Sequence, residues 1–242
     1  MKCKVILAAL LLAGGVQSAM AQKMILKMAG QEPVIYKVSQ MEYIMFEEGS
    51  FDEHEWVDLK LPSGTLWATC NIGADSPEDY GGYFAWGETE PKDTYNWSTY
   101  FDTEDNGSTF KKYNFNGGLT ELLPEDDAAT ANWGSGWQTP NLSQITELYN
   151  RSNTTTTWTT QNGVNGMLIT SHRNGKSIFL PAAGSRYNTS LNLAGSYGYY
   201  WSRSLYTGNS NYACDLSVKS DDIFWYYDDR YYGQSVRAVR KK

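Results

Sequence analysis

Alternating apolar and polar positions predict a strand near the C-terminus of this 242-residue chain. From 212 to 219, Cys214, Leu216 and Val218 occupy every second position. This period of two is typical of a strand with one buried and one solvated face. The solvated face is expected to carry Asp215, Ser217 and Lys219.

The same pattern predicts two hairpins further upstream. Apolar residues alternate through 66–72 after a turn signal at 62–64. The strand-like segments 166–171 and 177–184 lie on either side of Asn174–Gly175, a dipeptide typical of tight hairpin turns. We therefore expect a sheet-rich domain.

Helical spacing is clearest from 141 to 149. Asn141 is a suitable N-cap, and Gln144 stands where its side chain can complete a capping box. An apolar stripe follows at helical period, which predicts that the helix packs on a sheet. This stripe consists of Leu142, Ile145, Leu148 and Tyr149.

Two shorter helices are predicted from local signals. Ser76–Pro77 is a helix start that Gly81–Gly82 would stop. The acidic run 125–127 is favourable at a helix N-terminus. Polar stretches at 91–118, at 153–166 and at 185–198 are expected to be loops.

The N-terminus has the pattern of a secretory signal over 1–21. Lys2 and Lys4 precede an apolar run at 5–16, and Ala19-Met20-Ala21 forms a cleavage site. The run is shorter than the about 20 apolar residues that span a bilayer. We expect a bacterial protein that is exported to the periplasm, to the cell surface or into the medium, without a membrane span.

The mature chain is expected to begin with a small leader, residues 22–50, before a main domain over 51–242. Apolar runs at 24–28 and 33–38 flank a turn signal, and a third run follows at 41–46. These runs predict a β-hairpin. Because a lone hairpin is marginally stable in water, it must dock on the main domain, a partner or a second copy.

Net charge narrows the classes of partner. Loss of Lys2 and Lys4 with the signal takes the formal charge from −7 to −9. A negative chain is a poor ligand for a phosphate backbone, so nucleic acid binding is not expected. The cysteines left are Cys70 and Cys214, and both a disulfide and two buried thiols fit the sequence.

Tyrosine and aspartate dominate the segment 221–232, which has no clean period. One strand face could bury only part of its rings, so an exposed binding surface is predicted. Upstream, Tyr, Ser, Asn and Gly are mixed as in antibody paratopes. The alternative is a tyrosine-rich sheet whose rings pack on each other. The predicted binding residues are Tyr206, Asn209, Asn211, Tyr212, Asp215, Ser217, Lys219, Asp221, Asp222, Phe224, Tyr226, Tyr227, Asp228, Asp229, Tyr231 and Tyr232.

Five runs occur in a recognisable order, at 57–89, 125–149, 177–186, 199–205 and 231–240. Together they resemble the Fibrobacter succinogenes major paralogous domain, one of the C-type-lectin-like folds that also include the formylglycine-generating enzymes. The resemblance implies an α+β domain with a twisted antiparallel sheet, two flanking helices and long loops. It also implies that the N-terminal hairpin is a leader of the kind found before such domains in secreted proteins.

A second resemblance concerns C-type-lectin-like proteins that diversity-generating retroelements diversify near the C-terminus. Adenine mutagenesis of Asn codons in those variable proteins yields mainly Tyr, Asp, Ser, Phe, Ile and Cys. Here the scaffold-like runs YYWS and GQSVRAVR enclose a segment rich in such residues, which implies a diversified receptor. The residues concerned are Tyr212, Cys214, Asp215, Asp221, Asp222, Phe224, Tyr226, Tyr227, Asp228, Asp229 and Tyr232.

An enzyme is the alternative class of protein to a binding domain. Formylglycine-generating relatives hold copper with a close pair of cysteines near the C-terminus, and Cys214 has no such neighbour in sequence. The two histidines, His54 and His172, offer neither a His-rich metal site nor a Ser-His-Asp arrangement. The carboxylates at 125–127 could serve glycoside hydrolysis, but a helix N-terminus accounts for them.

Calcium is also not expected. Asp102, Glu104, Asn106 and Gly107 imitate the first half of a calcium loop, but Tyr113 stands where the bidentate Glu is needed. The Glu-Pro-Asn or Gln-Pro-Asp loop and the Trp-Asn-Asp triplet of calcium-dependent lectins are also missing.

We therefore expect a non-enzymatic receptor or adhesin that needs no cofactor and binds a protein or glycan at the cell surface. The main alternative is an envelope assembly subunit whose leader hairpin adds a strand to another chain's sheet. A formylglycine-generating type of enzyme is the second alternative.

Overall fold

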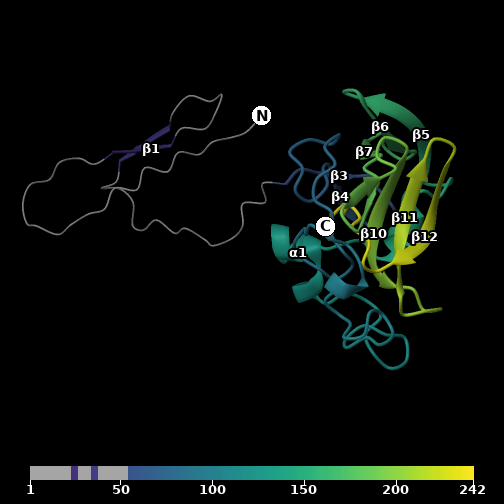
Figure 1. Cartoon of the computed structure of the whole chain (residues 1–242). Coiled ribbons are helices and arrows are strands. Elements are labelled where there is room, and N and C mark those ends of the chain that lie inside the picture. The colour runs from purple at the N-terminus through teal and green to yellow at the C-terminus, as the bar shows by residue number, and fades with distance from the viewer. Residues whose placement is uncertain (1–22, 27–33, 38–53) are drawn as a thin grey trace, which may run out of the picture. The chain divides into compact units, whose positions relative to one another are not determined.

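The computed structural model describes residues 23–26, 34–37 and 54–242 (Figure 1). The chain divides into two units, Met1–Gly49 and Ser50–Lys242. Antiparallel sheets and two α-helices make up the second unit, which confirms the predicted α+β class. None of the helices in these described stretches is long and apolar enough to cross a membrane.

The first unit contains an antiparallel hairpin. Its strands are β1 (Lys23–Leu26) and β2 (Val34–Lys37), which pair along their full length. This confirms the predicted hairpin. The predicted signal at 1–21 and the third apolar run at 41–46 lie outside the described residues.

A three-stranded sheet joins the two ends of the second unit. β3 (Trp56–Asp58) and β4 (Leu66–Ala68) form the predicted hairpin, closed where the Gly64 amide donates to the Leu61 carbonyl at 2.9 Å. β13 (Val239–Arg240) pairs with the other edge of β4. The chain therefore begins and ends this unit on one sheet.

A second sheet is built from β5 (Thr154–Gln161), β6 (Val164–Ser171) and β7 (Ser177–Pro181). The pairing of β6 with β7 confirms the predicted hairpin. The threonine-rich stretch predicted as a loop is instead the strand β5. Its β-branched residues suit a pleated strand, and the turn lies at Asn162 and Gly163, which have φ of 48° and 86°.

The third sheet consists of β10 (Tyr197–Leu205), β11 (Tyr212–Lys219) and β12 (Asp222–Asp229), in that order. Figure 1 shows the three strands side by side in green and yellow. The central strand β11 pairs with both neighbours, and β12 lies at one edge.

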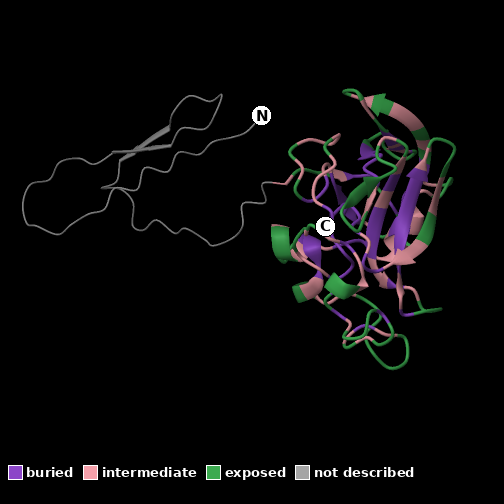
Figure 2. Cartoon of the chain, in the orientation of Figure 1, coloured by how far each residue is buried: buried purple, intermediate pink, exposed green. Residues whose placement is uncertain are grey.

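The predicted solvated face of β11 is wrong. Asp215 and Ser217 are buried, as are Cys214, Leu216 and Val218 (Figure 2). One face of the strand packs in the hydrophobic core, and the opposite face lies beneath side chains of the neighbouring strands and the C-terminal segment. Alternation along one strand shows which residues share a face, but not whether another segment covers that face.

Helix α2 (Leu142–Leu148) confirms the predicted capping box. The Gln144 amide donates to Asn141 Oδ1 at 2.9 Å, and the Asn141 amide donates to Gln144 Oε1 at 2.9 Å. Ile145 and Leu148 are buried in the same core cluster as the apolar side chains of β11. The helix therefore supports the third sheet from its core side.

Helix α1 (Ala128–Trp133) follows the acidic run, as predicted. Its cap is Asp127, whose carboxylate accepts hydrogen bonds from the amides of Ala129, Thr130 and Thr139.

The helix predicted from Ser76 is wrong. The Asp79 amide donates to the Ser76 carbonyl in an isolated turn, and Gly81 then takes a φ of 72°, which leads the chain away from a helix. The two helices of the unit are therefore α1 and α2, within the residues the structure describes.

The stretch 91–118 has little regular structure beyond the short 3-10 helix η2 (Trp97–Thr99), in accord with the predicted loop. It is not only a surface loop, because Tyr95, Tyr100 and Tyr113 are buried and pack against other parts of the unit. These rings attach the loop to the domain, next to the end of β12.

Candidate ligand-binding groove

An open groove of about 470 Å³ lies over one face of the β10–β11–β12 sheet. Because side chains alternate between the faces of a strand, the floor is built from every second residue. The register aligns them, since Tyr199 and Phe224 both lie opposite Ser217. The strands contribute Tyr197, Tyr199, Ser217, Phe224, Tyr226 and Asp228 to the lining.

The far wall comes from a small hairpin formed by β8 (Ser185–Tyr187) and β9 (Ser190–Asn192). Its turn includes Asn188 at a φ of 50°, a conformation that asparagine tolerates better than most residues. The hairpin and the residues after it contribute Ser185, Tyr187, Asn192 and Leu193, and Tyr232 completes the lining. This region was predicted to be a loop, and the hairpin corrects that prediction.

Asp228 is the charged residue of the lining. Gln234 Nε2 donates to its Oδ2 at 2.8 Å. Burial, and then the negative charge of Asp229, raises the pKa of the Asp228 carboxyl to about 6. The floor of the groove therefore carries a carboxylate that is difficult to ionise.

Asp215 lies on the same face of the sheet, opposite Tyr226, and is fully buried. Burial, followed by the charge of Asp228, raises the pKa of Asp215 well above its ordinary value. The nearby Gln234 side chain acts in the other direction and lowers the pKa of Asp215. Neither carboxylate oxygen of Asp215 has a hydrogen-bond partner in the described chain. Two carboxyl groups, one in the groove and one beneath it, thus raise the energy of each other's ionised form.

Tyrosines of β12 stack with tyrosines at the start of β11 and in the β10–β11 connection. The ring of Tyr227 is parallel to that of Tyr206, with centroids 4.1 Å apart, and to that of Tyr226, with centroids 4.9 Å apart. Tyr212 contacts Tyr227 at 5.3 Å. Part of the tyrosine-rich segment thus packs on itself, as the alternative interpretation required, while Tyr226 still lines the groove.

Other predicted binding residues lie at the two ends of the sheet. Lys219 Nζ is 3.3 Å from Asp221 Oδ1 at the β11–β12 turn, where Asp222 accepts a hydrogen bond from a backbone amide. Asn209 and Asn211 lie in the β10–β11 connection, and Asn211 donates to a backbone carbonyl of the 91–118 loop. These five residues do not line the groove.

Three of the predicted binding residues, which were expected to be exposed, are buried. Asp215 and Ser217 lie beneath neighbouring side chains, and Tyr231 is 8% exposed and packs on Trp97 at 4.8 Å. The Tyr231 hydroxyl donates to Asp229 at 3.3 Å. The predicted residues that the structure does bring together in the groove are Ser217, Phe224, Tyr226, Asp228 and Tyr232.

Six lining residues were missed. Tyr197 and Tyr199 had a usable signal, because they alternate on β10 as Phe224 and Tyr226 alternate on β12. No comparable signal marks the others, which reach the groove only through the tertiary position of the β8–β9 hairpin. The missed residues are Ser185, Tyr187, Asn192, Leu193, Tyr197 and Tyr199.

The residues considered for metal or redox chemistry are separated. Cys70 and Cys214 are both free thiols, and burial raises the pKa of the Cys214 thiol to about 12. Asp102, from the calcium-like sequence, forms a buried ion pair with Arg230 instead. Across the described ranges, no group of three or more His, Cys, Asp or Glu side chains is placed to hold a metal ion.

Comparison with known proteins found no family model, curated protein or solved structure that matches the chain.

Proposed function

We propose that this chain is an exported, non-enzymatic ligand-binding protein with a C-type-lectin-like fold, and that the groove over the β10–β11–β12 sheet is its binding site. The observation that carries the proposal is an open hollow lined by aromatic side chains on a paired sheet. Ligand sites are typically concave and mostly apolar, with a few placed polar groups. Strands that are paired and packed also lose little conformational entropy when a ligand binds.

The protonation of the Cys214 thiol and the position of His172 also favour a binding role over catalysis. A thiol acts as a nucleophile or metal ligand in its ionised form, and the raised pKa of Cys214 opposes ionisation. His172 is an exposed turn residue whose Nε2 is 2.8 Å from the Thr155 hydroxyl, remote in sequence from the groove residues. These features support a surface that recognises rather than transforms its ligand.

Retroelement diversification would act on β12 and its flanking loops. In this proposal, the outward positions Phe224, Tyr226 and Asp228 vary while the buried residues Leu216 and Val218 stay constant. Sequencing the gene and its downstream DNA in sibling isolates tests it. We expect a near-copy of the 3′ end that differs at adenines, next to a reverse transcriptase gene. An invariant β12 codon set with no such copy would remove this part of the proposal.

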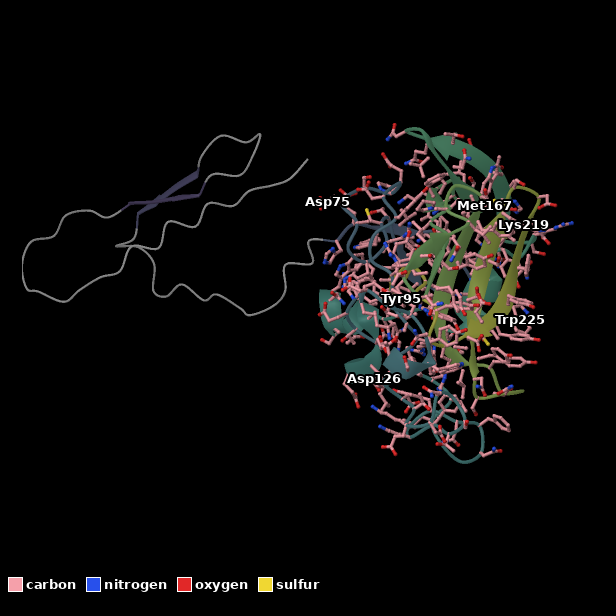
Figure 3. All side chains as sticks on the ribbon, in the orientation of Figure 1. Asp75, Tyr95, Asp126, Met167, Lys219 and Trp225 are labelled. Carbon is pink, nitrogen blue, oxygen red and sulfur yellow. The ribbon has the colours of Figure 1, made fainter. Side chains whose placement is uncertain are left out.

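The groove itself is tested with neighbouring residues of β12. Tyr226 lines it and is 47% exposed, whereas Trp225 is 38% exposed and does not line it. Figure 3 labels Trp225 on β12 and Lys219 at the end of β11, near the turn into β12. We expect Tyr226→Ala to weaken binding by at least about 30-fold, as at an aromatic hot spot, and Trp225→Ala to leave it nearly unchanged.

The measurement is binding of the full chain and both variants to an array of glycans and purified bacterial and host surface proteins. Both substitutions remove exposed side chains, so melting temperatures should stay within about 2–4 °C of the parent. Equal loss in the two variants, or loss only in Trp225→Ala, would place the binding surface elsewhere.

A further inference from the structure

The groove carries an acidic group and no basic group among its lining side chains in the described chain. Among the lining side chains of the described chain, Asp228 is the single charged group. Asp215 lies on the same sheet face with two unpartnered oxygens, and Gln234 Oε1 beside Asp228 is also buried without a partner. Gln234 Oε1 accepts hydrogen bonds, and both Asp215 oxygens accept them when the carboxyl is ionised. Buried acceptors without a donor are destabilising, so this arrangement favours a ligand that brings N–H donors.

Three positive side chains of the described chain are engaged elsewhere. Lys219 pairs with Asp221, Arg230 pairs with Asp102, and the Arg186 guanidinium lies 5.1 Å from the Tyr83 ring centroid.

The titratable groups that interact with the two carboxyls are themselves neutral or acidic. Burial, and then the carboxyl charges, raise the pKa values of Tyr199 on β10, Cys214 on β11 and Tyr232 after β12. Burial, and then the charge of Asp229, raises the pKa of Asp228. No basic group of the described residues therefore neutralises the floor of the groove.

Aromatic rings surround this acidic floor. The rings of Tyr197 and Tyr199 are stacked within 6° of parallel, 5.8 Å apart, and Phe224 meets Tyr226 edge to face at 6.2 Å. The faces of aromatic rings attract cations, most strongly where water is partly excluded. A carboxylate below rings of this kind is suited to an alkylammonium or guanidinium group.

The rim favours a protein as the source of that cation. Large apolar side chains are exposed around the groove, with Tyr187 at 44%, Leu193 at 52% and Tyr226 at 47%. Exposed aromatic and apolar side chains are typical of the centre of protein interfaces, where Tyr, Trp and Arg contribute most of the binding energy. A free amine would bury little of this rim.

We propose that the groove binds a lysine or arginine side chain that projects from a protein partner. The cationic head lies against the tyrosine rings and donates to Asp228, and its charge stabilises the ionised form of Asp215 beneath. The apolar stem of the side chain contacts Phe224 and Tyr226. This inference rests on the proposed function, because it names the ligand class of the same site.

The test titrates the full chain with N-acetyl-lysine methylamide and N-acetyl-arginine methylamide, and compares each with its neutral isostere, the norleucine or citrulline derivative. Binding is followed through NMR shifts of the tyrosine rings at pH 7.5. We expect the cationic probes to bind with Kd of about 1 mM and at least about 10-fold more tightly than the isosteres. The Asp228→Asn variant should lose this preference, and Asp222→Asn on the exposed end of β12 should keep it.

Other outcomes separate the inference from the proposed function. Equal binding of cationic and neutral probes, abolished by Tyr226→Ala, would overturn the cation preference and leave the groove as a binding site. No ring shifts with any probe would also overturn it, and array binding that depends on Tyr226 would then decide the proposed function alone. Tighter binding of putrescine than of the capped lysine would overturn the assignment to a protein side chain.

Discussion

Replacing Arg230 with alanine is expected to lower the free energy of unfolding by about 3–5 kcal/mol, the cost typical of leaving one member of a buried ion pair uncompensated. Arg230 is fully buried, and its Nη1 lies 3.4 Å from Asp102 Oδ2 and donates to the Tyr113 carbonyl at 3.0 Å. Its guanidinium also lies 3.7 Å from the Phe110 ring centroid. The substitution would leave the buried Asp102 carboxylate without its counterion, held by the amides of Lys112 and Tyr113, and would open a cavity among aromatic rings.

Urea unfolding of the full chain measures this effect. Lys219→Ala is the matched control, because it breaks an ion pair at the surface and should leave the urea midpoint nearly unchanged. The double variant Arg230→Met with Asp102→Asn should recover part of the loss, since it removes both charges and retains an apolar side chain. A loss below about 1 kcal/mol for Arg230→Ala would show that the buried pair does not hold the 91–118 loop to the end of β12.

Stability is expected to fall as the pH rises from 4 toward 7, through Asp215 and Asp228. Both pKa values are raised by burial, that of Asp228 from 3.8 to about 6. Between the unfolded and folded pKa values the folded protein binds more protons, so the free energy of unfolding decreases with pH. For Asp228 the fall begins above 3.8 and is complete above about 6. This rise in the pKa of Asp228 corresponds to a loss of about 3 kcal/mol in the free energy of unfolding.

The variant Asp228→Asn should reduce this dependence, because its amide oxygen can still accept the hydrogen bond from Gln234 without titrating, while the contribution of Asp215 remains. Thermal unfolding at pH 4.5 and 7.5 measures the difference, and Asp222→Asn is the exposed control on the same strand. Asp58 does not obscure the result. Its pKa is lowered, chiefly by hydrogen bonding with Lys60, so its contribution changes below its ordinary value of 3.8. A parent protein more stable at pH 7.5 than at 4.5 would contradict the prediction.

Local signals predicted the elements whose determinants lie within a few residues. Asn141 and Gln144 form their capping box without help from distant parts of the chain. Asn174–Gly175 set the β6–β7 hairpin in the same way. The Ser76–Pro77 start failed because the Asp79 carboxylate accepts a hydrogen bond from the Ser76 amide and closes a single turn in place of a helix. The polar composition of 153–166 predicted a loop, but its β-branched threonines form the strand β5.

The groove could be predicted only in part, since it depends on contacts between distant segments. The alternation on β11 placed Ser217 in the predicted set, and the tyrosine- and aspartate-rich composition of 221–232 placed Phe224, Tyr226 and Asp228 there. The burial of Asp215 depends on segments that no local pattern brings together with β11. The β8–β9 wall depends on the path of the chain between two sheets. Sequence therefore indicated the floor of the site but not its wall or its depth.

The β3–β4–β13 sheet also determines how the domain responds to mechanical load. Trp56 lies opposite Ala68, whereas Arg240 lies opposite Leu66, so the outer ends of β3 and β13 are at opposite ends of β4. Tension applied between Trp56 and Arg240 therefore shears the hydrogen bonds on both edges of β4 together, rather than opening them one at a time. The β10–β11–β12 sheet lies outside this direct path, so a ligand held in the groove and a pull on the two ends load different sheets.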